Sequence, residues 1–354
     1  MPPYDAFLLV SFGGPEGPDE VMPFLENVTR GRGIPRERLA GVAEHYYAVG
    51  GISPLNQQCR DLLAAVRADF GASGLPLPVY WGNRNWKPYL ADTMRAMAAD
   101  GVRRAVAFVT SAYSSYSGCR QYLDDIEAAR GQAGPLAPRI DKIRHFYNHP
   151  GFIEPFVDAT ARAIGSLPAT ARERVPLVFT AHSIPEAMAR ASGPPPGGRY
   201  PAQLREAARL VAERVGAGAH PWRLVYQSRS GPPAQPWLGP DVRDHLAELA
   251  AAGAGGAVLV PIGFITDHME VVHDLDVEAA QAAERLGLPL ARAATPGTDP
   301  RFVSMITALV TERLAGTTVP PAALGPRGPA VSSCPYDCCQ LAAPASRPGR
   351  PVQP

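Results

Sequence analysis

Short apolar runs recur along the chain, and helical patterns separate most of them. Each run has four to seven residues, which is short for a helix, and predicts a buried parallel β-strand. Alternation of such strands with helices predicts an α/β fold whose parallel sheets are covered on both faces. The predicted strands are residues 6–10, 78–81, 104–110, 140–146, 177–180, 223–227, 257–261 and 291–295.

Four predicted strands fall on each side of a turn-forming run, Asn-His-Pro-Gly, at residues 148–151. We therefore expect two α/β halves, residues 1–148 and 149–316, each with a four-stranded parallel sheet. From residue 317 the composition changes to Pro, Ala, Gly and Arg without a period. The tail, residues 317–354, is therefore expected to be mostly disordered, although it carries a cluster of cysteines.

Composition excludes several classes of protein. A net charge of +1 argues against nucleic-acid binding, which normally needs a basic surface. No apolar run approaches the roughly 20 residues of a membrane-spanning helix, and the N-terminus enters a strand without a charged signal segment. We expect a cytoplasmic protein. In that compartment five cysteines indicate metal binding or packing, and they do not indicate a disulfide framework.

Nearly every predicted strand is followed by hydroxyl, aromatic, His or Arg side chains. Ligands of open α/β sheets bind at the carboxyl ends of the strands, so these turns predict a broad cleft between the two half-sheets. Three common motifs are absent from the sequence: a Walker A phosphate loop, a dinucleotide fingerprint after a strand, and the Gly-x-Ser-x-Gly elbow of serine hydrolases.

Two of these turns carry the strongest candidates for chemistry. His182 follows the strand at 177–180, and Glu270 follows the strand at 257–261. Glu270, Asp274 and Glu278 are four residues apart, which places three carboxylates in one row along a helix. Because like charges in a row cost stability, the row indicates a cation site or a cation path. A solvated helix face is the alternative.

Six motifs together resemble the ferrochelatases, type II chelatases that insert Fe(II) into a porphyrin. They occur in family order over about residues 5 to 315 and read LVSFGGP at 9–15, GGISP at 50–54, TAHSIP at 180–185, QSRSGP at 227–232, WLGP at 237–240 and FITDHME at 264–270. The resemblance implies two similar Rossmann-like halves that hold the macrocycle in the cleft between them.

Within this family the chain is most similar to the actinobacterial coproporphyrin III ferrochelatases. The run YSSYSGCRQ at 113–121, the expected cytosolic location and the C-terminal cysteines carry that similarity. It implies Fe(II) and coproporphyrin III as substrates, coproheme as product, and a transient contact with the downstream coproheme decarboxylase. Some relatives carry a metal-ligating Tyr in the first turn, where this chain has Phe12.

Iron insertion replaces two pyrrole N–H protons, so it needs a base and a route for the metal. Neutral imidazole suits the first task, and weakly binding carboxylates suit the second. The resemblance places His182 at the pyrrole nitrogens as proton acceptor, metal ligand or both, with Glu270 facing it. Asp274 and Glu278 extend the path for Fe(II) or for released protons. Asp267 and His268 either take part directly or orient Glu270, and His273 is expected at the surface.

The four propionates of the substrate need donors at the cleft rim. Tyr46 and Ser53 lie in a Tyr-x-Ala-x-Gly-Gly-x-Ser-Pro run that matches the coproporphyrin branch. As propionate donors, Arg30 and Arg32 are not ranked against each other. For each polar loop residue the alternative is that it serves only the structure of its loop. The predicted substrate-binding residues are Tyr46, Ser53, Arg30, Ser114, Ser115 and Tyr116.

Cys334, Cys338 and Cys339 lie within six residues of the tail, which packing does not explain. Four thiolates hold a [2Fe–2S] cluster, so a fourth ligand must come from elsewhere. The resemblance favours Cys119, which lies near the upstream cluster ligand of the family, whereas Cys59 falls in an apolar helix and is expected to be buried. Zinc or free thiols are the alternatives to the cluster.

The sequence leaves other functions open. A protoporphyrin IX ferrochelatase is the nearest, and a cobalt or nickel chelatase for another tetrapyrrole is a second, although such sites usually present more than one His to the metal. A two-lobed porphyrin or metal carrier is the non-enzymatic possibility.

Overall fold

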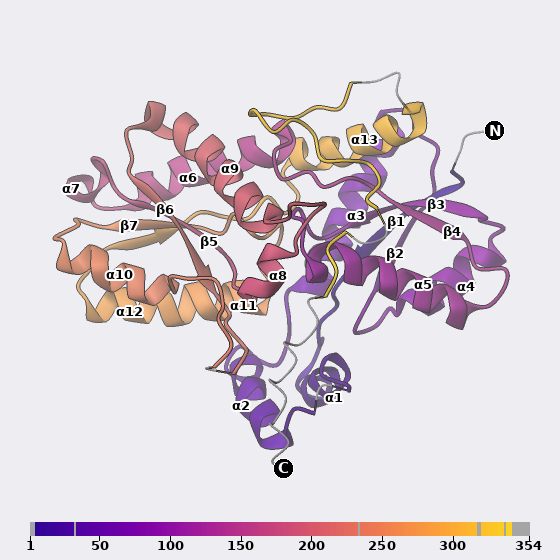
Figure 1. Ribbon diagram of the computed structural model, residues 1–354, viewed down its shortest axis with the longest axis horizontal. Helices are drawn as coiled ribbons and strands as arrows, with labels where there is room; N and C mark the ends of the chain where they lie inside the picture. Colours follow the sequence, from indigo (N-terminus) through magenta and orange to yellow (C-terminus); the bar gives the residue numbers. More distant parts are fainter. Residues whose placement is uncertain (1–3, 32, 233, 317–319, 336–337, 342–354) are drawn as a thin grey trace, which may run out of the picture.

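Two four-stranded parallel sheets lie side by side, one in each half of the chain (Figure 1). The first has the order β2-β1-β3-β4, with β1 (Ala6–Ser11), β2 (Val79–Asn83), β3 (Arg104–Val109) and β4 (Arg139–Lys142). The second repeats this order as β6-β5-β7-β8, with β5 (Leu177–His182), β6 (Trp222–Gln227), β7 (Ala257–Val260) and β8 (Leu290–Arg292). The computed structural model describes residues 4–31, 33–232, 234–316, 320–335 and 338–341.

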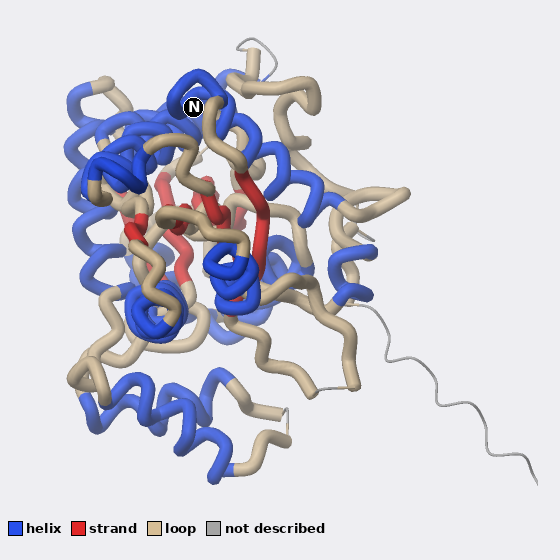
Figure 2. The backbone as a smooth tube through the Cα atoms, turned by 90° about the vertical axis from the view of Figure 1, so that its left-hand side faces the viewer, coloured by secondary structure: helices blue, strands red, loops and turns tan. Residues whose placement is uncertain are grey.

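Helices enclose both sheets (Figure 2). In the first half they are α1 (Pro18–Val28), α2 (Arg36–Tyr47), α3 (Leu55–Ala72), α4 (Leu90–Ala99) and α5 (Gln121–Ala133). In the second half they are α6 (Pro150–Ser166), α7 (Ala169–Arg172), α8 (Glu186–Arg190), α9 (Arg199–Arg214), α10 (Val242–Ala251), α11 (Met269–Val271), α12 (Ala280–Arg285) and α13 (Pro300–Ala315). Two π-helical segments, Tyr116–Arg120 and Val272–Ala279, lie beside α5 and α11.

All eight predicted strands are present, and the edge strands β4 and β8 end earlier than the apolar pattern predicts. The pattern continues past β4 to residue 146 and past β8 to residue 295. Ile143 and Phe146 are apolar because they are buried between the two halves, where they form no part of a sheet. An apolar run therefore marks burial, and it does not by itself distinguish a strand from a buried connection.

Alternate residues of β1 face opposite helical layers, as the twofold repeat of a strand requires. Ala6 and Leu8 pack with residues of α4 and α5, whereas Phe7 and Leu9 pack with residues of α3. The second sheet is covered in the same manner by α6 and α9 on one face and by α10 and α12 on the other. Both sheets are thus buried on both faces.

Helix α13 returns to the first half and joins the two cores. It packs against α3 and α6, and its Phe302 ring lies 6.2 Å from Phe108 and 6.0 Å from Phe146, measured between centroids. The side chain of Asp299 caps this helix before Pro300, as the sequence signal predicts. One apolar core consequently runs through both halves, and the boundary at residue 148 stays a prediction.

The helices α1 and α2 form a hairpin that stands apart from the sheets (Figures 1 and 2). Val21, Phe24 and Leu25 of α1 pack on Leu39 of α2, and Trp86 from the turn after β2 closes this small core. The hairpin therefore has a core of its own, distinct from the cores of the sheets. None of the described helices is long and apolar enough to cross a membrane.

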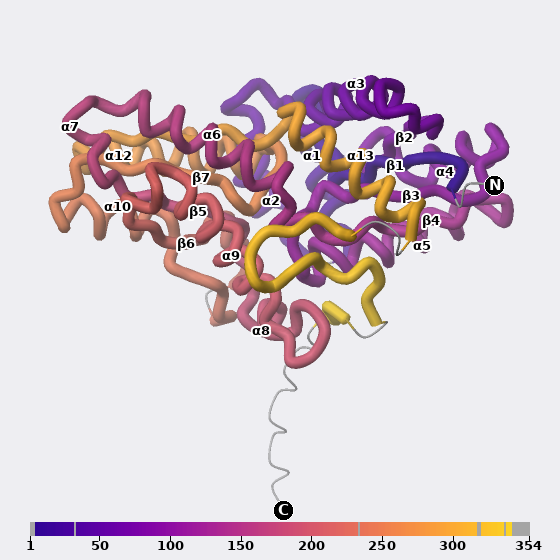
Figure 3. The backbone as a smooth tube through the Cα atoms, turned by 90° about the horizontal axis from the view of Figure 1, so that it is seen from above, coloured from indigo at the N-terminus to yellow at the C-terminus, as the bar shows by residue number. Residues whose placement is uncertain are grey.

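The tail residues 320–335 lie over the junction of the two halves (Figure 3). Asn148 donates to the carbonyl oxygens of Leu324 and Gly328 at 3.0 and 2.8 Å, and Arg327 pairs with Glu206 of α9 at 3.0 Å. We expected a mostly disordered tail because it lacks an apolar face. Its described part is held instead through its backbone carbonyls, while residues 317–319, 336–337 and 342–354 lie outside the described residues.

The contact between α6 and α13 can be tested at a glycine. A Cβ atom at Gly151 would overlap the backbone carbonyl oxygen of Arg301, which cannot rotate away. We expect Gly151→Ala to lower the free energy of unfolding by about 1–3 kcal/mol. Gly165 lies in the same helix with open space around it, so Gly165→Ala should be neutral or stabilising by up to about 1 kcal/mol. Urea unfolding of both variants checks this, and equal stabilities would contradict the close contact.

Candidate active site

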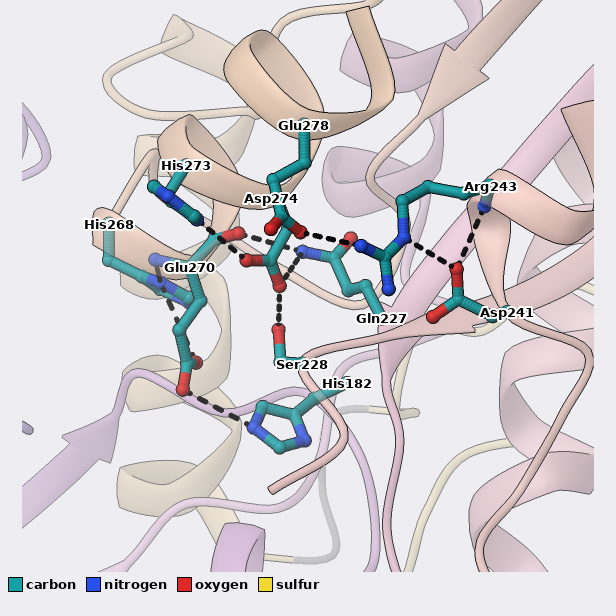
Figure 4. A network of polar contacts seen from close by, with 10 residues as sticks. All are labelled: His182, Gln227, Ser228, Asp241, Arg243, His268, Glu270, His273, Asp274 and Glu278. Atoms are coloured by element: carbon teal, nitrogen blue, oxygen red, sulfur yellow. Dashed lines mark hydrogen bonds and ion pairs between the residues drawn. The ribbon is translucent and has the colours of Figure 1, made fainter. Parts of the chain in front are cut away.

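His182 and Glu270 face each other in the structure, as the sequence predicts (Figure 4). His182 is the last residue of β5, and Glu270 lies in the short helix α11 that follows β7. The two side chains meet at 3.3 Å between Nε2 of His182 and Oε1 of Glu270. Tyr200 donates to the carbonyl oxygen of His182 at 2.8 Å, and Gln227 donates to that of Glu270 at 2.9 Å, so both backbones are held.

The pair is ionised in the free cleft. Burial alone lowers the pKa of His182, but the charge and the hydrogen bond of Glu270 outweigh burial and raise this pKa to about 9. Burial acts against ionisation of Glu270 as well, yet His182 brings the pKa of Glu270 down to about 2. At neutral pH the pair is therefore an imidazolium and a carboxylate, in contrast to the neutral imidazole that we expected from the sequence.

These shifts define the pH range in which the pair supports the fold. The raised pKa of His182 stabilises the folded state below pH 6.5, and this contribution is lost as the pH rises through about 9. The lowered pKa of Glu270 stabilises the folded state above pH 4.5, and this contribution is lost as the pH falls toward 2. The side chains are 32% and 51% exposed, so water screens the pair and its contribution is about 1 kcal/mol or less.

Asp267 and His268 orient the turn that carries Glu270. The backbone N–H of Glu270 donates to Nδ1 of His268 at 3.2 Å, which caps α11. The carboxylate of Asp267 is held by Arg292 at 3.1 and 3.2 Å and by Thr295 at 3.0 Å. Of the two roles left open by the sequence, the contacts support the orienting role for both residues.

The acidic row begins at Glu270 in α11, but Asp274 and Glu278 lie on a π-helical segment, Val272–Ala279, where the spacing predicts an α-helix. Asp274 accepts a hydrogen bond from Ser228, and its pKa is raised, first of all by burial. Glu278 pairs with Arg243 at 3.3 Å at the far end of the row (Figure 4). The row thus runs from His182 to a cationic side chain.

His273 is a residue whose place the sequence analysis missed. It is half-buried, and its Nδ1 lies 3.5 Å from Oδ1 of Asp274. One ligand atom each of His273, Asp274 and Glu278 can be chosen within 4.8 Å of one another, a spacing that could hold a metal ion. Its ring also stacks on that of His45 from α2, with centroids 3.8 Å apart. No sequence signal marked this contact, because it depends on the π-helical turn and on the α1–α2 hairpin.

The predicted propionate donors differ in availability. Tyr46 packs on Phe24 at 6.0 Å and faces Glu270, since burial and then the charge of Glu270 raise the pKa of Tyr46. Ser53 is buried against Gly14, and its Oγ accepts from the backbone N–H of Leu55 at 3.4 Å. Arg30 is exposed, and Arg32 lies outside the described residues.

Ser114 and Ser115 are buried and already bonded. Ser114 accepts from Gln203 of α9 through its hydroxyl at 3.0 Å, and its N–H donates back to that amide at 2.8 Å. The hydroxyl of Ser115 accepts from the N–H of Gly118 at 2.9 Å and caps the π-helical turn. Their placement favours a structural role over substrate binding, whereas Tyr116 is partly exposed.

Three side chains that were not among the predicted site residues connect the two halves near the His182–Glu270 pair. Gln58 of α3 bonds both the N–H and the carbonyl oxygen of Asp267, at 2.9 and 3.1 Å. Tyr113 donates to the carbonyl oxygen of Ile262 at 2.7 Å, and Gln203 holds Ser114. These contacts tie the turn before Glu270 to the first half.

The four cysteines predicted as a ligand set come together. Cys119, from the π-helical turn, forms one cluster with Cys334, Cys338 and Cys339 of the tail. Hydrogen bonds from Cys334 and Cys339 lower the pKa of the Cys119 thiol. Cys59 lies in the large apolar core, and burial raises its pKa to about 11. Four cysteine sulfurs gathered in one place fit a four-thiolate iron–sulfur centre.

The fold and the cleft chemistry define a chelatase-like protein. SirB from Bacillus subtilis with Fe3+ superposes with a TM-score of 0.55 at 12% identity, over 88% of this chain and 96% of that chain. At that identity the likeness concerns the fold alone.

The chain belongs to the ferrochelatase family, whose sequence pattern matches residues 4–314. A coproporphyrin III ferrochelatase of Streptomyces coelicolor is 56% identical over 356 residues, which cover 97% of this chain and 95% of the relative. A coproporphyrin III ferrochelatase of Frankia alni is 58% identical over 340 residues, which cover 95% and 86%.

The ionised pair can be tested directly. We expect the imidazole of His182 to titrate near pH 9 in the wild type. In Glu270→Gln the carboxylate charge is gone while burial remains, so this pKa should fall toward the ordinary value of about 6.5. Nitrogen-15 NMR of labelled histidine side chains measures both values. Glu278→Gln, at the far end of the row, should leave the pKa near 9. An unchanged pKa in Glu270→Gln would contradict the pairing.

Proposed function

We propose that this chain inserts ferrous iron into coproporphyrin III and releases coproheme, as a step of heme synthesis. The observation that carries this proposal is the His182–Glu270 pair, 3.3 Å apart, in a chain of the ferrochelatase family. The names of its relatives support coproporphyrin III as the porphyrin.

Insertion of one Fe(II) ion releases two pyrrole protons, and in this proposal His182 accepts one of them while water takes the other. In the free cleft His182 already holds a proton, so its Nε2 cannot accept another. A cation that reaches Glu270 offsets the negative charge that raises the pKa of His182. The imidazole then gives up its proton to water and becomes a base for a pyrrole N–H at the moment when the metal arrives. Metal delivery and proton removal are thereby coupled through one carboxylate.

Asp274 and Glu278 extend the route along which the cation approaches Glu270. Carboxylate oxygens bind Fe(II) weakly enough to pass it on. Arg243 pairs with Glu278 and also with Asp241 at 3.1 Å, so it can release Glu278 without losing every partner. His273 stands beside Asp274 and offers a nitrogen ligand at the same level of the row.

The rim of the cleft would bind the four propionates. Tyr46 is the strongest donor among the candidates, because it faces Glu270 from the α1–α2 hairpin. Arg30 and Tyr116 are exposed or partly exposed and have room for a carboxylate partner. Ser53 keeps its hydroxyl proton for donation, while Ser114 and Ser115 contribute by holding the loop after β3.

The decisive experiment is an anaerobic insertion assay with Fe(II). We expect kcat/KM for coproporphyrin III to exceed that for protoporphyrin IX at least tenfold, because the two extra propionates gain rim donors. His182→Ala should keep the fold and lose more than nine-tenths of turnover, since the base is gone. Equal kcat/KM for the two porphyrins would favour a protoporphyrin IX ferrochelatase. Preference for cobalt or nickel would favour a chelatase for another tetrapyrrole, and stoichiometric binding without turnover would favour a carrier.

A pair of charge-removing variants gives the matched control. Glu270→Gln should slow insertion far more than Glu278→Gln, because of these two carboxylates only Glu270 contacts His182. Porphyrin binding, followed by fluorescence, should persist in both. Equal losses would mean that the row acts only as a diffuse negative field.

We also propose that Cys119, Cys334, Cys338 and Cys339 bind one [2Fe–2S] cluster. When bound, the cluster would supply four strong bonds to cysteine sulfur, three to the tail and one to the body. Cys119 fixes one corner on the first half, and the N–H of Gly193 donates to Sγ of Cys339 at 3.0 Å from the second half. The cysteines are thus held by both halves at a place outside the His182–Glu270 pair.

The cluster proposal predicts a coloured protein with a defined ligand set. Anaerobically purified protein should contain about two iron and two sulfide ions per chain. Cys119→Ser should remove the colour and expose the tail to protease, whereas Cys59→Ser should stay coloured, because Cys59 lies in the apolar core. Zinc or free thiols in the wild type, or loss of colour only in Cys59→Ser, would contradict the ligand set.

We further propose a cytoplasmic location and a transient contact with a coproheme decarboxylase that consumes the product. Five free cysteines fit a reducing compartment. Val42, Tyr47 and Ile52 expose apolar surface on and just after α2, and such surface suits a brief protein contact.

A further inference from the structure

His145 is a buried histidine with unpaired ring nitrogens. It is 4% exposed, and neither Nδ1 nor Nε2 has a hydrogen-bond partner of good geometry among the described residues. An unpaired polar group inside a protein costs about 1–3 kcal/mol, so native structures rarely keep one without a reason. The His145 ring therefore points to a partner that the described residues do not supply.

The ring lies beside the cysteine cluster. His145 lowers the pKa of the Cys119 thiol through its charge and a side-chain contact, and Cys119 acts on His145 in the opposite sense. The other groups that act on His145 are Lys142, whose charge lowers its pKa, and the backbone of Ser111. Burial favours the neutral imidazole, which keeps one N–H to donate.

We propose that His145 donates a hydrogen bond to the iron–sulfur centre, at Sγ of Cys119 or at the inorganic sulfide beside it, and thereby raises the reduction potential of the centre. This inference rests on the [2Fe–2S] cluster proposed above. A hydrogen bond to sulfur stabilises the added negative charge of the reduced cluster, and the potential of such clusters responds to these bonds. The bond also satisfies the nitrogen that is otherwise unpaired.

A donor role agrees with the ligand count better than a role as a ligand. Four cysteine sulfurs already gather in the cluster, so a fifth ligand is not needed. The N–H of Gly193 plays the same part for Cys339, at 3.0 Å from its sulfur. His145 would complete this arrangement at Cys119, the ligand from the body of the protein.

His145 also belongs to the segment that docks the tail. The neighbouring Arg144 donates to the carbonyl oxygen of Ala322 at 2.9 Å and forms a buried pair with Glu312 at 2.8 Å. Loss of His145 could therefore loosen the tail without any direct effect on the cluster. A test must separate the potential of the cluster from its occupancy.

The experiment uses the full chain, purified anaerobically, as wild type, His145→Leu, His145→Gln and His245→Leu. His245 is a second buried histidine, paired with Glu248 and Arg223 and far from the cysteines in the fold, so it serves as the control. Iron and sulfide analysis reports occupancy, and a dye-mediated redox titration reports the potential. Pulsed EPR of the reduced cluster in protein with nitrogen-15 histidine measures the coupling of the histidine nitrogen to the cluster. This coupling is weak for a hydrogen bond and strong for a ligand.

We expect His145→Leu to lower the ratio of reduced to oxidised cluster about tenfold at a fixed potential, which is a shift of about 59 mV for one electron. His145→Gln should recover part of the shift, because its amide also donates. The wild type should show one weak nitrogen coupling, typical of a hydrogen bond, that both His145 variants lose and His245→Leu keeps.

Three results would overturn the inference, and they differ from one another. Unchanged potentials in both His145 variants with full occupancy would exclude the donor role while leaving the cluster proposal intact. A strong nitrogen coupling in the wild type would make His145 a ligand and not a donor. Wild-type protein without iron and sulfide would refute the cluster, and the role of His145 with it.

Discussion

The apolar core shared by the two halves is the constraint on which the site depends. His182 belongs to one sheet, and Tyr46 belongs to the other half, so their separation is set by how the halves pack and not by either sheet alone. Helix α13 fixes that packing, because Phe302 packs against both Phe108 and Phe146 while the helix also contacts α6. Close-packed interiors transmit small shifts. Loose packing between the two halves would therefore displace Tyr46 relative to His182 and the other proposed metal-insertion residues.

Polar contacts then refine what the apolar core sets. Gln58 reaches from α3 to the turn that carries Glu270, and Gln203 reaches from α9 to the loop after β3. Polar side chains near the site can thus hold its loops in place and need not bind the substrate. Ser114 and Ser115 illustrate this, since both have the residue type of a propionate donor, and both are buried and bonded to the framework.

The strands and their number could be predicted from the sequence, because they depend on local pattern. The facing of His182 and Glu270 was implied by the family resemblance, and the ends of β5 and β7 meet at one sheet edge. The π-helical segment could not be predicted, since its spacing satisfies an α-helix equally well. The docking of the tail was missed for a different reason. Its contacts use backbone carbonyls, which every sequence possesses, and their donors Asn148 and Arg144 lie far away in the chain.

The ionised His182–Glu270 pair lies at the inner end of the acidic row. At its outer end Glu278 is partly neutralised by Arg243. In the middle, burial raises the pKa of Asp274, so this carboxyl holds its proton more readily than an exposed one. At the inner end the pKa of Glu270 is about 2, and its carboxylate is fully ionised. Both ends of the row are thus paired with a cationic side chain, and in the proposed reaction a cation that reaches Glu270 replaces the charge of His182 there. Imidazolium at that point keeps the inner carboxylate from being an uncompensated charge while the cleft is empty. In the proposed reaction the departure of the His182 proton is therefore the counterpart of metal entry.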